Sequence, residues 1–107
     1  MDMNQRVTML ESIVGGEEEE STLLAYLQIA GQAILNKAYP YYSPSNPTDV
    51  PEKYQVLQVE IAAAAMNKRG AESETQHIEN GIHRNYQNAY IPDDMLRQVV
   101  PSIGLLL

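Results

Sequence analysis

The sequence predicts a mainly α-helical fold: a small helical bundle of three main helices plus a short C-terminal helix, with a β-hairpin or extended arm before the last helix. Apolar residues recur at helical spacing in three segments, and glycine or proline residues separate those segments. Residues 71–90 lack such a period. A length of 107 residues fits one domain spanning residues 1–107.

The first two helices follow from apolar stripes and their punctuation. Residues 3, 7, 10 and 14 are apolar, and Gly15-Gly16 supplies a stop for this first helix. The second helix is expected to begin near the acidic run before Ser21, because acids suit the positive end of a helix. It should end near Ala38, before Tyr39-Pro40. Its predicted stripe is Leu23, Leu27, Ala30 and Ile34, broadened by Leu24 and Leu35.

A proline-rich loop is expected next. Residues 39–51 hold four of the six prolines, and each proline fixes φ and withholds a donor. Pro51 suits the first turn of a third helix, predicted from Glu52 to Arg69 with Gly70 as its C-terminal cap. This helix should be covered on most of its circumference. Its two predicted stripes are Tyr54, Leu57, Ile61 and Ala65, and Val56, Val59, Ala63 and Met66.

The arm and the last helix complete the prediction. Asn80-Gly81 is a strong hairpin-turn dipeptide, and a bulged loop there would place Ile78 opposite Ile82. A two-stranded hairpin is marginal in water, so the arm must lie either on its own helices or on another chain. Residues 93–100 should form a short helix between Pro92 and Pro101, followed by an apolar tail.

Charge and composition exclude several classes of function. The net charge is −7, whereas binding to phosphates needs positive charge. This argues against nucleic-acid binding and against sequence-specific binding in particular. The absence of cysteine fits a chain that matures in a reducing cytoplasm. The longest apolar run, residues 61–66, is far too short to cross a membrane, and the first ten residues do not read as a signal peptide.

No feature of the sequence predicts an enzyme. There is no cysteine nucleophile, no nucleophile-elbow serine motif, no phosphate-binding loop and no zinc-protease motif. His77 and His83 lie near Glu79, but no third imidazole or thiolate accompanies them, so no metal site is expected. We therefore expect no catalytic residue, no cofactor and no metal.

The second half of the chain resembles a known family. Residues 67–75 (NKRGAESET), residues 79–86 (ENGIHRNY) and residues 91–94 (IPDD) occur in the order seen in the head-tail connector (adaptor, head-completion) proteins of tailed bacteriophages. In that family a core helix ends in N-x-R-G-A/S-E-G/S-E. A Gly-Ile-x-Arg-x-Tyr segment and an I-P-x-x-hydrophobic final helix follow. The first two helices are also similar, whereas the loop at residues 39–51 is longer than usual.

The resemblance implies a structural role without catalysis. Members of the family form a homo-oligomeric ring of about a dozen copies below the portal protein. The ring extends the DNA channel and docks the next head-completion or tail component. The resemblance also implies that the protein is located at the head-tail interface of the virion, and in the host cytoplasm during assembly. The alternative left open is a small acidic helical binding module, an antitoxin-like protein or a regulatory subunit, that pairs with a basic partner protein.

Three groups of candidate residues follow from this interpretation. We expect Arg84 to pair with Glu72 or Glu74 of an adjacent subunit and Tyr86 to fill a pocket; the alternative is that the arm folds back on its own helices. The subunit-interface candidates are Arg69, Gly70, Glu72, Glu74, Gly81, Ile82, Arg84 and Tyr86. The partner-binding candidates are Tyr39, Tyr41, Tyr42, Leu105 and Leu106, where the tyrosines alternatively wrap the core edge. The candidates for an acidic lining of the channel, or for a merely solvated helix start, are Glu17, Glu18, Glu19 and Glu20.

Overall fold

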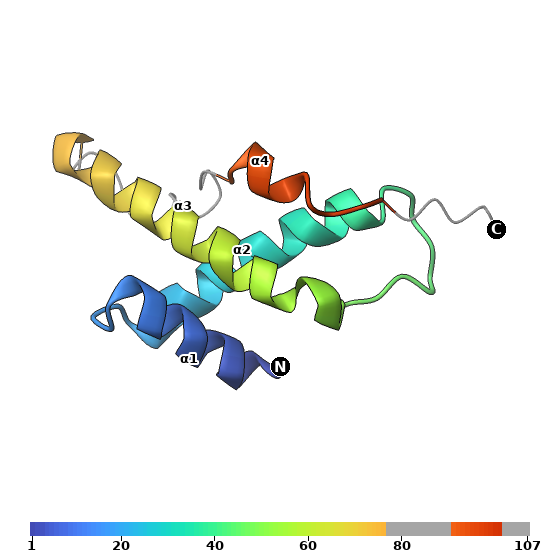
Figure 1. Cartoon of the computed structure of the whole chain (residues 1–107), viewed down its shortest axis with the longest axis horizontal. Helices are drawn as coiled ribbons and strands as arrows, with labels where there is room; N and C mark the ends of the chain where they lie inside the picture. The colour runs from blue at the N-terminus through green and yellow to red at the C-terminus, as the bar shows by residue number, and fades with distance from the viewer. Residues whose placement is uncertain (77–90, 102–107) are drawn as a thin grey trace.

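The computed structural model describes residues 1–76 and 91–101, and side chains outside residues 69–76. The elements in order are α1 (Met3–Val14), α2 (Glu20–Ala38), the 3-10 turn η1 (Glu52–Tyr54), α3 (Gln55–Gln76) and α4 (Asp93–Leu96) (Figure 1). The described residues contain no strand. The prediction of a mainly helical protein is therefore confirmed for this part of the chain.

Both ends of α1 are fixed by local hydrogen bonds. At its start the Asp2 carboxylate accepts the N–H of Gln5 at 2.8 Å, and the Gln5 side chain accepts the N–H of Asp2 at 2.9 Å. At its end Gly15 adopts a left-handed φ of 107°, and its N–H donates to the Glu11 carbonyl at 3.1 Å. The predicted first helix and its glycine stop are confirmed.

The second helix and the loop after it also follow the prediction. α2 ends at Ala38, and no helix or strand is present between it and Pro51. One reason is that Pro40 disfavours helical backbone at Tyr39. All four residues of the predicted stripe are buried. Leu24 and Leu35, which broaden that stripe, are half-buried against the core.

The third helix begins where expected but with a tighter turn. The N–H of Tyr54 donates to the Pro51 carbonyl at 2.8 Å, so η1 forms the first turn before α3 takes over at Gln55. Most of both predicted stripes is buried. Val56 is the exception, at 48% exposed, because it lies on the side of α3 that faces solvent.

The predicted end of the third helix is wrong. α3 passes through Gly70 and ends at Gln76, so Gly70 is an interior residue and not a cap. A glycine inside a helix costs about 1 kcal/mol relative to alanine, and the following Ala71 and Glu72 are good helix formers with no proline near them. The first six residues of the arm predicted from residue 71 therefore belong to α3. The hairpin at Asn80-Gly81 lies outside the described residues.

The last helix is shorter than predicted. α4 covers only Asp93–Leu96, with Pro92 as the preceding cap residue. The N–H groups of Gln98 and Val99 then donate to carbonyls three residues back, at 3.2 and 3.0 Å, and form tight turns. Pro101 explains why the helix does not reach Val100, because a proline disfavours helical backbone in the residue before it.

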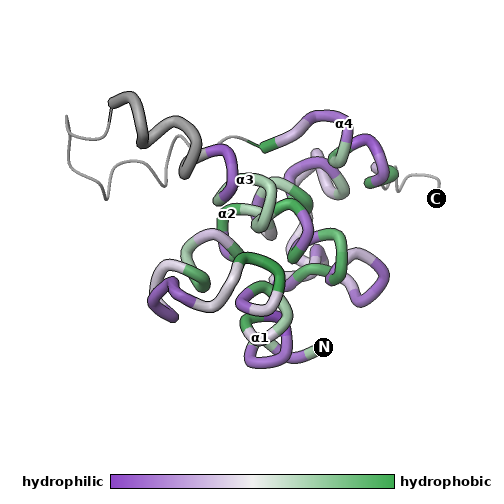
Figure 2. Tube along the Cα trace, turned by 60° about the vertical axis from the view of Figure 1, so that its left-hand side comes forward, coloured by the Kyte–Doolittle hydropathy of each residue, from purple (hydrophilic) through white to green (hydrophobic). Residues whose placement is uncertain are grey.

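α3 is the centre of the packing. It contacts both α1 and α2, and α4 packs on α2 (Figure 1). α1 and α4 lie on opposite sides of the α2–α3 pair (Figures 1 and 2). Hydrophobic stretches gather in the middle of the molecule and hydrophilic ones at its rim (Figure 2). Ala62, Ala63 and Ala65 are buried, and such small side chains let helices approach closely.

Candidate functional site

Most of the predicted subunit-interface residues lie at or beyond the end of α3. Arg69, Gly70, Glu72 and Glu74 belong to the last two turns of α3, where the backbone alone is described. Gly81, Ile82, Arg84 and Tyr86 lie outside the described residues, as do Leu105 and Leu106. Residues 69–74 are helical and continue α3 without a break from its buried part.

The four predicted acidic residues lie together at the start of α2. Glu17, Glu18, Glu19 and Glu20 are all exposed. Glu20 is in the first turn of α2, where a negative charge favours the helix, and Glu19 is the cap residue without a side-chain hydrogen bond. This run therefore presents its charge to solvent at the turn between α1 and α2.

The three predicted tyrosines divide into two kinds. Tyr39 is half-buried and packs against the hydrophobic core. Tyr41 and Tyr42 are 77% and 90% exposed. Tyr41 and Tyr42 are therefore open to solvent, while Tyr39 packs at the beginning of the loop.

The loop that carries these tyrosines has its own hydrogen bonds. The Asn46 side-chain amide donates to the Tyr41 carbonyl at 3.0 Å, and the Asn46 N–H donates to the Ser43 carbonyl at 3.0 Å. The Ser43 and Ser45 hydroxyls lie 3.0 Å apart. Together with the fixed φ of Pro44 and Pro47, these bonds give residues 41–47 a defined turn.

The far end of the loop is held by a buried arginine of α1. The Arg6 guanidinium is only 2% exposed and binds both carboxylate oxygens of Asp49, with Nη1 to Oδ1 at 3.0 Å and Nη2 to Oδ2 at 2.8 Å. Nη1 also donates to Oε1 of Gln58 at 2.9 Å, and Nη2 to the Met1 carbonyl at 3.0 Å. Such bidentate, charge-assisted bonds are among the stronger hydrogen bonds in proteins.

Gln58 connects this arginine to α2. Its amide Nε2 donates to the Leu27 carbonyl at 2.7 Å while its Oε1 accepts from Arg6. The amide lies beside Gly31, where an added Cβ would come within 2.8 Å of Nε2 and 3.3 Å of a Val50 methyl group. Because Gly31 has no side chain, the Gln58 amide has room beside it to bond the Leu27 carbonyl. The backbone of Gly31 itself is ordinary α-helix.

Gln55 makes a parallel connection one turn earlier in α3. Its Nε2 donates to the Val50 carbonyl at 3.0 Å, and its Oε1 accepts from the amino group of Met1 at 2.7 Å. We call Arg6, Asp49, Gln55 and Gln58, with the backbone groups they bind, the Arg6 cluster. It joins the chain start, α1, α2, the loop and α3.

The charges of the Arg6 cluster stabilise each other. The hydrogen bond from Arg6 holds the pKa of the Asp49 carboxyl below its ordinary value, and the bond from the Val50 N–H, at 2.7 Å, acts in the same direction. The same pairing with Asp49 raises the pKa of Arg6, against the opposing effect of burial. The ion pair is therefore formed at neutral pH, and its chemistry is structural.

The Arg6 cluster was not predicted from the sequence, although the positions of Arg6 and Gln58 indicate it. Arg6 follows Met3 by three residues and precedes Leu10 by four, so it lies on the apolar stripe of α1. Gln58 lies in the same way between Tyr54 and Ile61 on α3. A polar side chain on a buried stripe indicates a buried partner, because such groups are almost always hydrogen-bonded.

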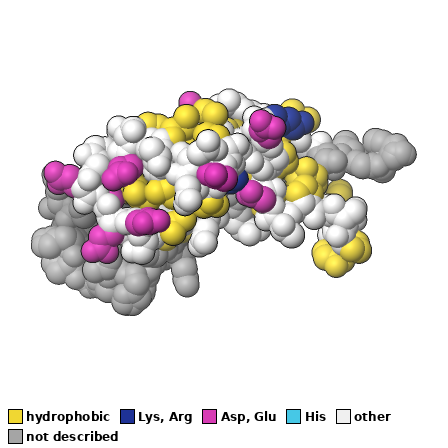
Figure 3. All heavy atoms as spheres, turned by 90° about the horizontal axis from the view of Figure 1, so that it is seen from below, with side chains coloured by type: hydrophobic (Ala, Val, Ile, Leu, Met, Phe, Trp, Pro, Cys, Tyr) yellow, Lys and Arg dark blue, Asp and Glu magenta, His cyan; other side chains and the backbone are white. Residues whose placement is uncertain are grey.

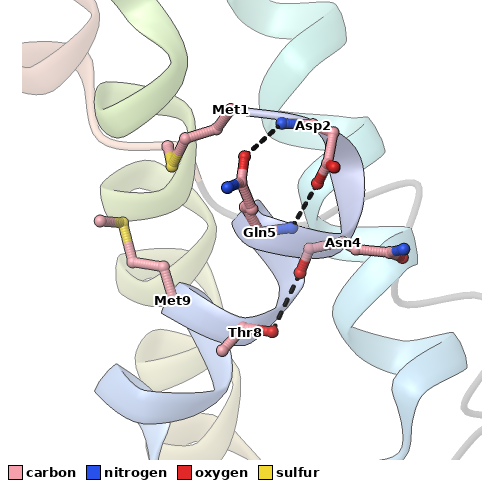
Figure 4. Close-up of a pocket in the computed structure, with 6 residues that line it drawn as sticks. All are labelled: Met1, Asp2, Asn4, Gln5, Thr8 and Met9. Carbon is pink, nitrogen blue, oxygen red and sulfur yellow. Dashed lines mark hydrogen bonds between the residues drawn. The ribbon is translucent and has the colours of Figure 1, made fainter.

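A shallow depression of about 360 Å³ lies beside the first half of α1. Its lining includes the methionines Met1 and Met9, whose side chains extend toward α3 (Figure 4). The polar groups beside them take part in the helix cap and in a bond from the Thr8 hydroxyl to the Asn4 carbonyl at 3.0 Å. The Asp2 carboxylate, the Gln5 side-chain oxygen and the Thr8 hydroxyl are thus engaged in hydrogen bonds at the start of α1.

The face that carries α1 shows acidic side chains dispersed among apolar ones, with few basic groups (Figure 3). Among the described residues, no three His, Cys, Asp or Glu side chains are grouped as metal ligands would be. Within the same part of the chain, every helix is too short or too polar to span a membrane.

Comparison with known proteins identifies a family. The model of the phage gp6-like head-tail connector protein family matches residues 13–99. This range includes α2, α3, α4 and the loop with Tyr41 and Tyr42, and it begins within α1. Searches of curated proteins and of solved structures gave no significant match.

Proposed function

Because the chain belongs to the phage gp6-like head-tail connector family, we propose that it is a structural component of the virion that assembles into a ring below the portal. The match over residues 13–99 carries this proposal, since it includes most of the fold. The match also bears on the two functions that the sequence left open. It favours the connector over the small acidic binding module.

A ring is a physically reasonable assembly for a chain of this size. The chain exposes 6832 Å². Two lateral contacts that each bury roughly 800 Å² on this subunit would cover about a quarter of that surface. Contacts between two different surfaces of identical subunits close into a ring when the rotation between neighbours allows it.

The end of α3 and the segment after it are the proposed lateral contact. In this proposal Arg84 of one subunit pairs with Glu72 or Glu74 of the next, and Tyr86 fills an apolar pocket there. Because α3 reaches Gln76, the backbone of Glu72 and Glu74 is helical. The remaining interface candidates Arg69, Gly70, Gly81 and Ile82 belong to the same contact.

The acidic run at the start of α2 is the proposed lining of the channel. Its four carboxylates are exposed, and negative charge on a channel wall repels the phosphates of passing DNA. A density map of the ring that placed residues 17–20 on the outer rim would contradict this part. Leu105 and Leu106 are proposed to contact the portal or the tail-side neighbour.

The lateral contact is tested by replacing residues 77–86 with a Gly/Ser segment of equal length. We expect the helical circular dichroism signal to persist, because the described helices lie outside the replaced segment, and we expect assembly to be lost. Mass by light scattering, with and without portal protein, measures assembly. Arg84→Ala and Tyr86→Ala should weaken it separately, whereas Arg97→Ala, at the exposed residue directly after α4, is the matched control.

Two results would contradict the lateral contact. Rings that still close after the replacement would show that these residues are not needed between subunits. A replaced chain that unfolds would show that the segment belongs to the subunit's own core.

A further inference from the structure

The last described stretch of the chain lies across the helices as a strap. We call residues 91–101 the strap: it consists of α4 and the residues on either side of it, and it packs on α2 (Figure 1). Pro92, before α4, is buried, and Val99, after α4, is only 1% exposed. The apolar side chains of α4 itself are half-buried. The strap is therefore held most firmly near its two ends.

The hydrogen bonds inside the strap are local. The N–H groups of residues 97, 98 and 99 donate to carbonyls three or four residues earlier, at 3.0 to 3.2 Å. α4 has only four residues and no side-chain cap. Helices shorter than about 12 residues are marginal in water without tertiary packing. The local structure of the strap and its contacts with the core should therefore be lost together.

The hydroxyl of Tyr54 joins the end of the strap to the turn before α3. It accepts the N–H of Val100 at 3.0 Å. The side chain of Val100 is 70% exposed, so this residue is held by its backbone more than by packing. Val99, which is buried, directly precedes it. The hydrogen bond and the buried side chain therefore hold the strap at the same place.

The acceptor of this bond is fixed on the core. Tyr54 is 9% exposed and belongs to the hydrophobic core. Its N–H donates to the Pro51 carbonyl at 2.8 Å, and the ammonium group of Lys53 lies 5.1 Å from the centroid of its ring. When the bond to Val100 breaks, the strap is therefore the partner that moves.

We propose that the strap opens as one unit while α1, α2 and α3 stay folded, and that the Tyr54 hydroxyl is the latch, the group whose bond keeps the strap closed. Opening a segment with few buried side chains needs less free energy than unfolding the whole chain. One neutral hydrogen bond shifts such an equilibrium about 5-fold.

The position of the strap in the sequence gives this motion a consequence. Residues 77–90 precede the strap and residues 102–107 follow it, and both stretches carry candidate assembly residues. In the closed form the two ends of the strap, where these stretches begin, are fixed on the core. In the open form they are released from it. The inference goes beyond the proposed function and concerns the single subunit.

Native-state hydrogen exchange of the full chain, followed for each amide by NMR, tests the opening. The N–H groups of residues 98–100 should exchange at least about 100-fold faster than those of Val59 and Ile61, after correction for intrinsic rates. Their exchange should also depend less on denaturant, because less surface is exposed. Equal protection of the two sets would overturn the inference, since the strap would then open only when the whole chain unfolds.

The latch is tested by Tyr54→Phe, which removes the hydroxyl and keeps the ring. Exchange at residues 98–100 should become about 5-fold faster, because the N–H of Val100 loses its acceptor. The matched control is Tyr41→Phe, the same chemical change at a tyrosine that is 77% exposed, and it should leave these rates unchanged. Wild-type exchange at residues 98–100 in Tyr54→Phe would overturn the latch.

The independence of the strap is tested by Val7→Ala, which trims a buried side chain of α1. α1 and α4 lie on opposite sides of the α2–α3 pair, so the contacts of Val7 are kept when the strap opens (Figures 1 and 2). Exchange at Val59 and Ile61 should become at least about 5-fold faster, while residues 98–100 keep their wild-type rates. Equal acceleration of both sets would overturn opening as a separate unit. Ring formation is measured separately by light scattering, so its failure would overturn the proposed function and leave the strap standing.

Discussion

α3 is joined to its neighbours in two different ways. Against α2 its contact is mainly apolar: Val59 and Ile61 of α3 and Leu27 of α2 are fully buried, and one hydrogen bond runs from Gln58 to the Leu27 carbonyl. Toward α1 and the loop it also uses polar side chains, with Gln55 and Gln58 binding across the interface. The apolar contact is non-directional and tolerates small shifts. The Arg6 cluster is directional and fixes where α1 and the loop lie.

The largest effect is expected for Arg6→Ala, which removes the centre of the polar contact. It should lower the free energy of unfolding by about 3 kcal/mol, because Oε1 of Gln58 and the Met1 carbonyl lose their charged donor and the buried stem leaves a cavity. Chemical denaturation measures the change. Arg97→Ala, at an exposed arginine, should stay within about 0.5 kcal/mol of the wild type. Equal effects of the two substitutions would mean that the Arg6 cluster adds no stability.

A smaller effect is expected for Gly31→Ala, which acts where the apolar and polar contacts meet. Alanine favours the helix by up to about 1 kcal/mol, but its Cβ would come within 2.8 Å of Nε2 of Gln58 and push it from the Leu27 carbonyl. We expect a net loss of about 1 kcal/mol in the free energy of unfolding. In a Gln58→Ala background the same substitution should be neutral or stabilising. A loss of the same size in both backgrounds would exclude Gln58 as the cause.

The smallest effect concerns pH. The pKa of Asp49 is lower in the folded chain than in the unfolded chain, mainly through its bond to Arg6. The stability it contributes is therefore present above the unfolded pKa and is lost as pH falls through the folded pKa. We expect the stability difference between the wild type and Asp49→Asn to be constant near neutral pH and to shrink below about pH 4.

The control for this prediction is the same pair in an Arg6→Met background, where the pH dependence of the difference should be smaller, because the bond from the Val50 N–H remains and the bond from Arg6 does not. Denaturation midpoints measured from about pH 2 to pH 7 provide the readout. A difference that grew toward low pH would contradict the assigned direction.

The apolar contact was predictable from the sequence and the polar contact was not. Stripes at helical spacing depend on neighbours three and four residues away, so α1, α2 and most of α3 were predicted correctly. Gly15 and Gly70 show a limit of this approach. The first glycine has a left-handed φ at a helix end, while the second lies inside α3, and both look like stops in the sequence.

The Arg6 cluster depends on pairs that are far apart in the sequence. Arg6 and Asp49 are separated by 43 residues, and Arg6 and Gln58 by 52. Spacing within a helix reveals that Arg6 faces the core, but only the packing of three segments reveals its partner. The burial of the loop tyrosines could not be predicted from local sequence either. Tyr39 packs on the core and Tyr41 is exposed, although both lie in the same proline-rich segment.

The most direct test of the proposed role is electron microscopy of the purified chain mixed with portal protein from the same phage. We expect a closed ring of copies stacked coaxially on the portal, in which each copy touches two sister copies. A complex in which single copies bind the portal without touching one another would contradict the proposed role.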